Sequence, residues 1–288
     1  MKNYGTIAID ELKICYVAHQ DSMLVLENVE VGDYLDYLNY RFYRLTNERF
    51  RYYYDVFDAE GEVAQLKFGH YTDADDAEHY VFLRVLNPIL YQAERMHRLL
   101  ALPDAMGLYF NNYTAIDLAF DTNTNVTTLI KKMMRDEEVT TIFNGKAVKD
   151  RKGILQGVTF EYSTTLQRLH YPTITFKQRK AIAKKDEGVT VQAYDKKAEI
   201  ENRSDKQYIL EYYGNPKRLY RLEVRLRYRE LKEFFASRHI VPKAGVLLNA
   251  DLLKEMFIYH LSAVIRFRRG RKRIRWTELL GMSCQGVE

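Results

Sequence analysis

The chain has 288 residues, 47% of them hydrophobic and 29% charged, a balance that excludes a disordered protein and indicates a soluble globular one. No apolar run is long enough to span a membrane, and residues 1–13 lack the apolar core and cleavage site of a signal peptide. The two cysteines, Cys15 and Cys284, lie at opposite ends without CxxC spacing, which argues against a zinc site or a disulfide framework. We therefore expect a cytoplasmic protein without membrane contact, whose net charge of +5 is by itself weak evidence for a polyanionic partner.

The first hundred residues predict a mixture of strands and helices. Runs rich in β-branched and aromatic residues predict strands at residues 11–18, 22–29, 49–58, 63–71 and 79–87. The third and fourth of these runs flank a short turn that contains glycine, so they predict a hairpin. Two segments repeat apolar residues near helical spacing and predict helices, at residues 33–45 and 89–102. An acidic loop is expected between them, at residues 72–78.

The middle of the chain predicts more strands and carries the candidate chemistry. A helix is expected at residues 123–137, with Asn123 to Asn125 as candidate caps. Residues 188–199, GVTVQAYDKKAE, predict a strand that runs into a helix, and residues 220–230 predict a strand that leads into another helix. The other predicted strands of this region are residues 114–121, 140–145, 157–163 and 172–181.

The region from residue 241 onward differs from the rest. Residues 250–267 place their apolar side chains on one helical face, and a dense basic cluster follows at residues 266–275. The cluster has no acid, and its basic residues are Arg266, Arg268, Arg269, Arg271, Lys272, Arg273 and Arg275. Such a cluster attracts phosphate backbones through counterion release, although a solvated helix end would carry the same composition. We expect a helical, basic C-terminal region at residues 241–288 that contacts nucleic acid.

Two aspartates share one face of the strand IDLAFD. Residues i and i+2 of a strand point to the same side, so Asp117 and Asp121 lie opposite the apolar set, with the small Ala119 between them. Two carboxylates so placed can converge on Mg²⁺ or Mn²⁺, which prefer oxygen ligands. A solvated acidic face is the alternative.

The strand at residues 220–229 alternates without a break. One face is apolar, and the other carries Glu223 among arginines at positions 221, 225, 227 and 229. Arginines bind phosphate oxygens bidentately, and Glu223 could be a third metal ligand. An exposed strand whose charges pair with their neighbours would have the same sequence.

Tyr194 stands on the polar side of its strand, with Gln192 and Lys196. A tyrosine nucleophile must lose its proton well below its ordinary pKa of about 10, and Lys196 could help. The chain has 23 tyrosines, so position alone does not distinguish Tyr194 from those that pack or cap.

The order and wording of four motifs resemble the trans-acting replication initiators of small rolling-circle plasmids, which are related to the HUH nicking endonucleases. They are IDLAFD at residues 116–121, TITFKQRKA at 173–181, QAYDKKAE at 192–199 and YRLEVRLR at 220–227, preceded by FLRVLNP at 82–88. The resemblance covers about residues 80–237. It departs from the family at Lys177, where glycine is expected, and the His-hydrophobic-His pair of related nickases is absent from the sequence.

This resemblance implies an α+β fold, with a central antiparallel sheet, helices packed on one face and an open polar face that carries the active site. It implies an initiator domain at residues 1–240, whose core is about residues 80–237 and whose N-terminal part binds origin DNA. Tyr194 would attack a DNA phosphodiester and leave a 5′-phosphotyrosyl link and a free 3′-OH, with Lys196 assisting. Asp117, Asp121 and Glu223 would hold Mg²⁺ or Mn²⁺.

The expected partners are single-stranded or hairpin origin DNA, a host helicase and polymerase, and a second copy of the chain, in the cytoplasm of a bacterium. DNA would be guided by Arg221, Arg225 and Arg227 and by the basic cluster, Arg266, Arg268, Arg269, Arg271, Lys272 and Arg273. The main rival is a DNA-binding protein without chemistry, such as a repressor or an iteron-type initiator. A tyrosine recombinase fits less well because the centre is rich in strands, and a nuclease that uses water would form no covalent adduct.

Overall fold

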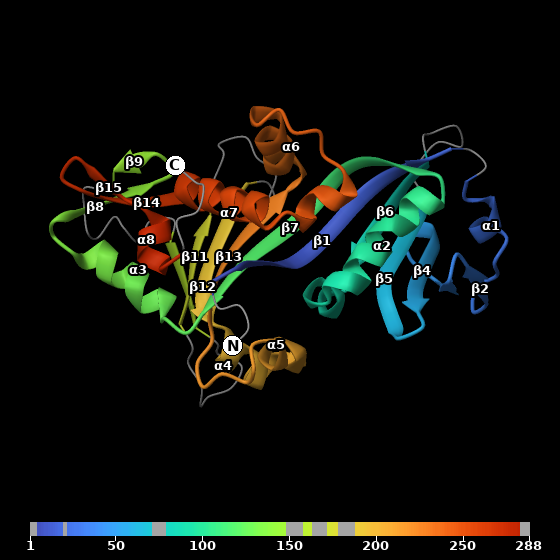
Figure 1. The fold of residues 1–288 in the computed structure, drawn as a ribbon, viewed down its shortest axis with the longest axis horizontal. Helices are drawn as coiled ribbons and strands as arrows, with labels where there is room; N and C mark the ends of the chain where they lie inside the picture. The colour runs from blue at the N-terminus through green and yellow to red at the C-terminus, as the bar shows by residue number, and fades with distance from the viewer. Residues whose placement is uncertain are drawn as a thin grey trace. The chain divides into compact units, whose positions relative to one another are not determined.

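The structure is a computed structural model that describes residues 5–19, 22–70, 79–147, 158–162, 172–177 and 188–282 (Figure 1). Some of the predicted features lie wholly or partly outside these residues, namely the acidic loop at 72–78, the ends of the strand at 157–163, and residues 178–181 of the TITFKQRKA motif. The chain divides into two compact units. Unit 1 comprises Met1–Ile9, Asp117–Glu230 and Asn249–Glu288, and unit 2 comprises Asp10–Ile116 and Leu231–Leu248. The predicted functional boundary at residue 240 stays a prediction.

Unit 1 is built on strands in the order β10, β11, β12, β13, β7. Their bounds are β10 Val158–Tyr162, β11 Pro172–Lys177, β12 Thr190–Asp195, β13 Tyr220–Arg227 and β7 Leu108–Thr122, of which the second part belongs to unit 1. A smaller sheet has the order β15 (Lys272–Ile274), β14 (Ile265–Arg269), β8 (Val139–Phe143), β9 (Lys146–Ala147). The helices are α3 Val126–Arg135, α4 Lys196–Arg203, α5 Gln207–Tyr212, α7 Ala250–Val264 and α8 Trp276–Leu280.

Alternation along the strands of unit 1 separates an apolar face from a polar one. Val191 and Ala193 of β12 and Leu222 and Val224 of β13 are fully buried, because α3 and α7 pack against these strands. Burial of such side chains is the main favourable contribution to folding. The predicted class, an α+β fold with an antiparallel sheet and helices on one face, is confirmed.

Side-chain caps fix where two helices of unit 1 begin. Asn125 accepts a hydrogen bond from the amide of Thr128 at 2.9 Å and starts α3. Asp195 accepts one from the amide of Ala198 at 2.9 Å and starts α4 directly after β12. Each cap satisfies an amide that has no partner within its helix. The cap at Asp195 therefore places Tyr194 at the end of a strand, next to a helix start.

Unit 2 is built on strands in the order β7, β1, β6, β5, β4, β3, β2. Their bounds are β1 Ile7–Ala18, of which the part from Asp10 onward belongs to unit 2, β2 Tyr34–Tyr37, β3 Tyr40–Leu45, β4 Phe50–Asp58, β5 Gly61–His70 and β6 His79–Val85, together with the first part of β7. The helical segments are α1 Leu24–Glu27, η1 Asn87–Tyr91, α2 Ala93–Ala105, the second part of α6 Tyr228–Ser237, and η3 Ala244–Leu248. The predicted hairpin of residues 49–58 and 63–71 is confirmed as β4 and β5.

The segment at residues 33–45 was predicted to be a helix and is a hairpin, β2–β3, in which Tyr37 pairs with Tyr40. Its turn residues, Leu38 and Asn39, have φ of 52° and 64°, as a two-residue turn with the twist of the flanking strands requires. The helical spacing of tyrosine and leucine was misleading, because the same residues also alternate at the period of a strand.

The segment at residues 22–29 was predicted to be a strand and contains the short helix α1 instead. Met23 and Leu26 are buried, whereas Leu24 and Val25 are about half exposed. That burial pattern repeats every three residues and so follows a helical turn rather than strand alternation.

The C-terminal region is only partly helical. Helix α7 ends at Val264, and the basic cluster forms the hairpin β14–β15. Ile265 and Phe267 are buried and alternate with arginines, and β14 pairs with β8, so the region belongs to unit 1. Gly270 supplies the positive φ, 56°, at the turn. No helix within the described ranges is long and apolar enough to cross a membrane.

Candidate active site

The polar face of unit 1 brings together residues from β12, β13 and β7. In the antiparallel register of β12 and β13, Tyr194 is opposite Arg221, Gln192 is opposite Glu223, and Thr190 is opposite Arg225. Directly opposed residues point to the same side of a sheet, so these side chains share one face. The structure thus places Tyr194, Glu223 and the arginines on the side that the sequence predicts.

Tyr194 and Glu223 form the centre of this face. The Tyr194 hydroxyl donates a hydrogen bond to Oε2 of Glu223 at 2.7 Å. The other carboxylate oxygen of Glu223 accepts from Nε of Arg225 at 2.5 Å. Tyr194 is 8% exposed and Glu223 is 1% exposed, so the pair is largely shielded from water. A buried carboxylate orients the hydroxyl and is placed to accept its proton.

Asp117 lies near Glu223, as both carboxylates contact Nε of Arg225. Oδ2 of Asp117 is 3.4 Å from Nε of Arg225, and Oδ1 accepts a hydrogen bond from Nη1 of Arg227 at 3.0 Å. Burial lowers the pKa of Arg225, but the negative charges of Glu223 and Asp117 outweigh burial and hold that pKa above its ordinary value. The arginine side chains here are more than one third exposed, so they form the accessible part of a face that is otherwise buried.

Asp121 is separated from this group by its own partner. Arg221 donates from Nε to Oδ1 at 2.7 Å and from Nη2 to Oδ2 at 2.6 Å, and both side chains are fully buried. The bidentate geometry occupies both carboxylate oxygens. Nearby, burial raises the pKa of Tyr213, and the charge of Asp121 raises it further. Asp121 and Arg221 are therefore a buried ion pair in this structure.

Lys196 is the first residue of α4 and is 2% exposed. Its ammonium donates to Oε2 of Glu199 at 2.8 Å and lies 5.8 Å from the centroid of the Tyr194 ring. Its charge is therefore near the aromatic ring and already paired with a carboxylate. Any assistance to Tyr194 from Lys196 stays a prediction.

The residues present fit a divalent ion in part. Asp117 and Glu223 are neighbouring carboxylates, and Mg²⁺ is commonly held by one or two carboxylates together with substrate phosphate. Asp121 does not fit, since Arg221 occupies its oxygens. Within the described part of the chain, no three His, Cys, Asp or Glu side chains are grouped to hold a metal ion. A metal at this face would depend on two of the three predicted ligands.

Sequence reasoning did not single out Thr175, which extends the polar face onto β11. Thr175 is fully buried, is opposite Gln192 in the register of β11 and β12, and accepts a hydrogen bond from Nε2 of Gln192 at 3.3 Å. The alternation of threonine and apolar residues in TITF was the available signal.

The predicted DNA-binding residues lie in two places. Arg221 is buried, whereas Arg225 and Arg227 are partly exposed at the candidate active site. In the hairpin β14–β15, Arg266 is half-buried, and the exposed basic residues are Arg268, Arg269, Arg271, Lys272 and Arg273. Arg269 is bound by Asp136 at 2.9 Å, so part of the positive charge of the hairpin is neutralised within unit 1.

No family model and no curated protein matches this sequence. Among solved structures, the chain is similar to the rolling circle replication initiator protein from Geobacillus stearothermophilus. The two share 17% sequence identity, with 96% of this chain and 95% of that chain covered and a TM-score of 0.49. A function for this chain therefore depends on its own motifs and side-chain geometry.

Proposed function

We propose that this protein initiates rolling-circle replication by nicking one DNA strand through attack of Tyr194. The observation that carries the proposal is the hydrogen bond of 2.7 Å from the Tyr194 hydroxyl to the buried carboxylate of Glu223. A buried tyrosine that only packs can bond a backbone carbonyl, as Tyr54 bonds that of Leu26, whereas a nucleophile needs a group that orients it and also takes its proton, as a carboxylate can. Two partly exposed arginines beside it, Arg225 and Arg227, are ion-paired with Glu223 and Asp117 and are also suited to phosphate oxygens.

In the proposed reaction the oxygen of Tyr194 forms a bond to the scissile phosphorus while the phosphorus–O3′ bond breaks. The proton of the hydroxyl passes to Glu223, and the departing 3′ oxygen takes up a proton to become the free 3′-OH. The DNA keeps a 5′-phosphotyrosyl link, which preserves the energy of the broken bond for later rejoining. The 3′-OH then primes synthesis by a polymerase.

A divalent ion, Mg²⁺ or Mn²⁺, would be held by Asp117 and Glu223. When bound, such an ion polarises a phosphate oxygen and stabilises the charge that develops there. Arg225 now neutralises both carboxylates, and its guanidinium is also suited to a phosphate oxygen. Arg227 would orient the strand from the rim of the site.

The proposal is tested by the covalent adduct. The full-length protein is incubated with a labelled single-stranded origin oligonucleotide and Mn²⁺, and the products are separated under denaturing conditions. We expect an adduct with the wild type, none with Tyr194→Phe, and an unchanged adduct with Tyr259→Phe, a matched control at an exposed tyrosine of the same unit. A normal adduct from Tyr194→Phe would exclude Tyr194 as the nucleophile.

The second candidate function is a DNA-binding protein without chemistry, which the exposed basic hairpin β14–β15 favours. The same gel, read beside a fluorescence-anisotropy measurement of binding to the same oligonucleotide, separates the two functions. Binding to origin DNA without any adduct, in the presence or absence of the metal, would support the second candidate.

A further inference from the structure

The strands of unit 2 have one apolar and one mixed face. The apolar face includes Leu12, Val85, Ala64 and Val56, which are paired across neighbouring strands and buried. Helix α2 lies over these strands (Figure 1), and Arg95 of α2 binds Asp58 of β4 at 2.6 Å.

The other face carries aromatic and basic side chains in two rows that the strand register defines. The first row is Lys13, Arg84, Gln65, Asp55, Tyr43 and Tyr34, and the second row is Cys15, Phe82, Lys67, Tyr53 and Leu45. Apart from Cys15, which is buried, these residues are half-buried or exposed. We call these two rows the aromatic–basic face. Unlike the opposite face, it presents partly exposed rings, those of Tyr34, Tyr43, Tyr53 and Phe82.

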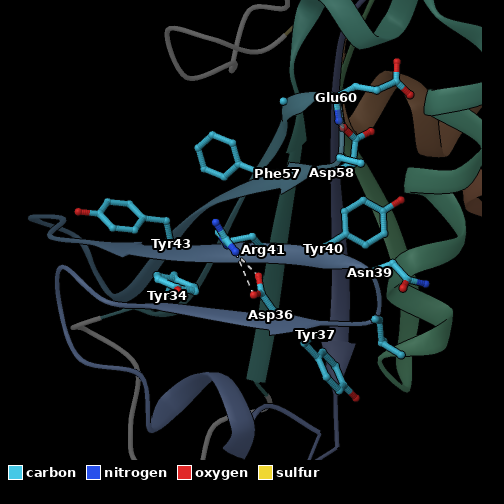
Figure 2. A pocket seen from close by; sticks show the side chains of 13 residues that line it. Tyr34, Asp36, Tyr37, Asn39, Tyr40, Arg41, Tyr43, Phe57, Asp58 and Glu60 are labelled. Carbon is cyan, nitrogen blue, oxygen red and sulfur yellow. Dashed lines mark hydrogen bonds and ion pairs between the residues drawn. The ribbon is translucent and has the colours of Figure 1, made fainter.

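One end of the aromatic–basic face is hollowed. A depression of about 1110 Å³ lies at the hairpin β2–β3, and Figure 2 shows the rings of Tyr34, Tyr43 and Phe57 on the same side of the strands as Arg41. The guanidinium of Arg41 lies 4.3 Å from the centroid of the Tyr34 ring and is held by Asp36 at 2.8 Å. Tyr34 is 57% exposed. Flat, accessible rings with a fixed guanidinium are the elements on which single-stranded bases stack.

The other end of the face is positively charged. Lys67 lies in the second row with Lys13 and Arg84 beside it, and no acid of the described residues forms an ion pair with Lys67. Burial lowers the pKa of Lys67, and the charges of Lys13, Arg84 and Arg49 lower it further. Lys13 is itself bound to Glu11 at 2.5 Å, which leaves a surplus of positive charge at this end. A phosphate group would relieve the repulsion between these cations.

We propose that the aromatic–basic face of unit 2 binds single-stranded DNA, with bases stacked on its rings and phosphates on its lysines and arginines. In the second row a cation, Lys67, lies between the rings of Phe82 and Tyr53, and in the first row the cations lie at one end and the rings of Tyr43 and Tyr34 at the other. Rings and cations on one strand face are the elements that non-specific single-strand binding uses. The inference rests on the proposed function only in taking DNA as the ligand, and it gives unit 2 a role as the holder of the unpaired strand.

Fluorescence anisotropy tests the inference with the full-length protein and fluorescein-labelled oligothymidine. We expect Tyr43→Ala, Tyr53→Ala and Phe82→Ala each to weaken binding about tenfold, while Tyr43→Phe and Tyr53→Phe bind as the wild type because the ring remains. Lys67→Gln should reduce the slope of log affinity against log salt concentration by about 0.7. Tyr259→Ala, at an exposed tyrosine of unit 1, is the matched control, and unchanged melting temperatures show that the variants are folded.

Wild-type affinity in all three alanine variants would overturn the inference. So would equal competition by duplex DNA, whose bases are already stacked and closed to these rings. Failure of the proposed function looks different: no adduct would form with any oligonucleotide, although the alanine variants would still bind oligothymidine more weakly than the wild type.

Discussion

At the scale of a single residue, the proposed reaction requires Glu223 as the base, since its buried carboxylate accepts the hydrogen bond of Tyr194. Glu223→Gln keeps the size and a hydrogen-bonding group but removes the base. We expect single-turnover adduct formation to fall about 100-fold or more at neutral pH. In the variant the rate should rise with pH toward the ordinary pKa of tyrosine, about 10.

The measurement is the adduct rate over a range of pH, with Glu199→Gln as the control, because Glu199 binds Lys196 rather than Tyr194. Identical pH profiles for the wild type and Glu223→Gln would show that Glu223 does not take the proton.

Asp121 and Asp117 lie on one strand face but have different surroundings. Asp121→Asn leaves the fully buried Arg221 without its charge partner, and breaking such a pair costs about 3–5 kcal/mol of unfolding free energy. Asp117→Asn weakens contacts to partly exposed arginines, and we expect it to lower the unfolding free energy by about 1 kcal/mol. Chemical denaturation without metal measures both values.

Titration of Mn²⁺ in the adduct assay completes the comparison. The Mn²⁺ requirement should increase for Asp117→Asn and stay near that of the wild type for any Asp121 variant that folds. Equal losses of unfolding free energy for the two variants would show that the pair of Asp121 and Arg221 contributes no more to stability than the contacts of Asp117.

Local alternation was sufficient to place Tyr194, Glu223 and both aspartates on polar strand faces, because side chains of a strand change sides at every residue. It could not show that Arg221 takes Asp121 out of the metal-ligand set. That pairing joins residues 100 positions apart and depends on β13 being next to β7. The strand order was needed to show that Asp121 pairs with Arg221, whereas Asp117 and Glu223 share Arg225.

At the scale of elements, prediction from the sequence was wrong where the same residues fit both the helical and the strand period. The tyrosines of β2–β3 fit both a helix and a strand. In the structure they lie in a hairpin, whose turn residues Leu38 and Asn39 adopt left-handed conformations. The basic cluster was predicted to be the end of a helix because the apolar pattern of α7 continues into Ile265, within a predicted helix that ran to Phe267. Those two side chains are instead the buried side of β14, whose partner β8 is far away in the sequence.

Helix α2 is bound to the β4–β5 turn by ion pairs, of which the pair of Arg95 and Asp58 is the most buried, and its stability should depend on pH. Arg95 donates to both carboxylate oxygens of Asp58, at 2.6 and 2.9 Å. Burial alone would raise the pKa of Asp58, but these hydrogen bonds hold that pKa below its ordinary value. A carboxylate whose folded-state pKa is depressed stabilises the fold above its unfolded pKa, and the contribution is lost as pH falls through the folded pKa.

We therefore expect Asp58→Asn to lower the unfolding free energy by about 2 kcal/mol at neutral pH. The difference from the wild type should begin to shrink below about pH 4, the ordinary pKa at which the carboxylate of the unfolded chain is protonated, and should vanish below the lower folded-state pKa. Urea denaturation of both proteins at several pH values gives the comparison. A difference that does not change with pH would mean that the ion pair does not stabilise α2.

At the scale of the whole molecule, charge is distributed unevenly although the net charge is only +5. Unit 1 exposes arginines and a lysine on the hairpin β14–β15, and unit 2 exposes basic side chains on the aromatic–basic face. The first surface has no rings between its exposed cations, because the aromatic Phe267 points inward. The two surfaces should therefore bind DNA differently. The hairpin should bind the phosphate backbone of any DNA, and the aromatic–basic face should bind strands whose bases are unpaired.

The hairpin β14–β15 gives the last prediction. Arg268, Arg271 and Arg273 are exposed, and replacing all three by glutamine should weaken binding to duplex DNA of any sequence by a similar factor. Each lost phosphate contact lowers the slope of log affinity against log salt concentration by about 0.9 for duplex DNA. Anisotropy with duplexes of unrelated sequence, at several salt concentrations, measures both effects. Arg41→Gln in unit 2 is the control, since its guanidinium is already held by Asp36 and it should leave the duplex slope unchanged. A loss confined to one duplex sequence would show that the hairpin reads bases rather than the phosphate backbone.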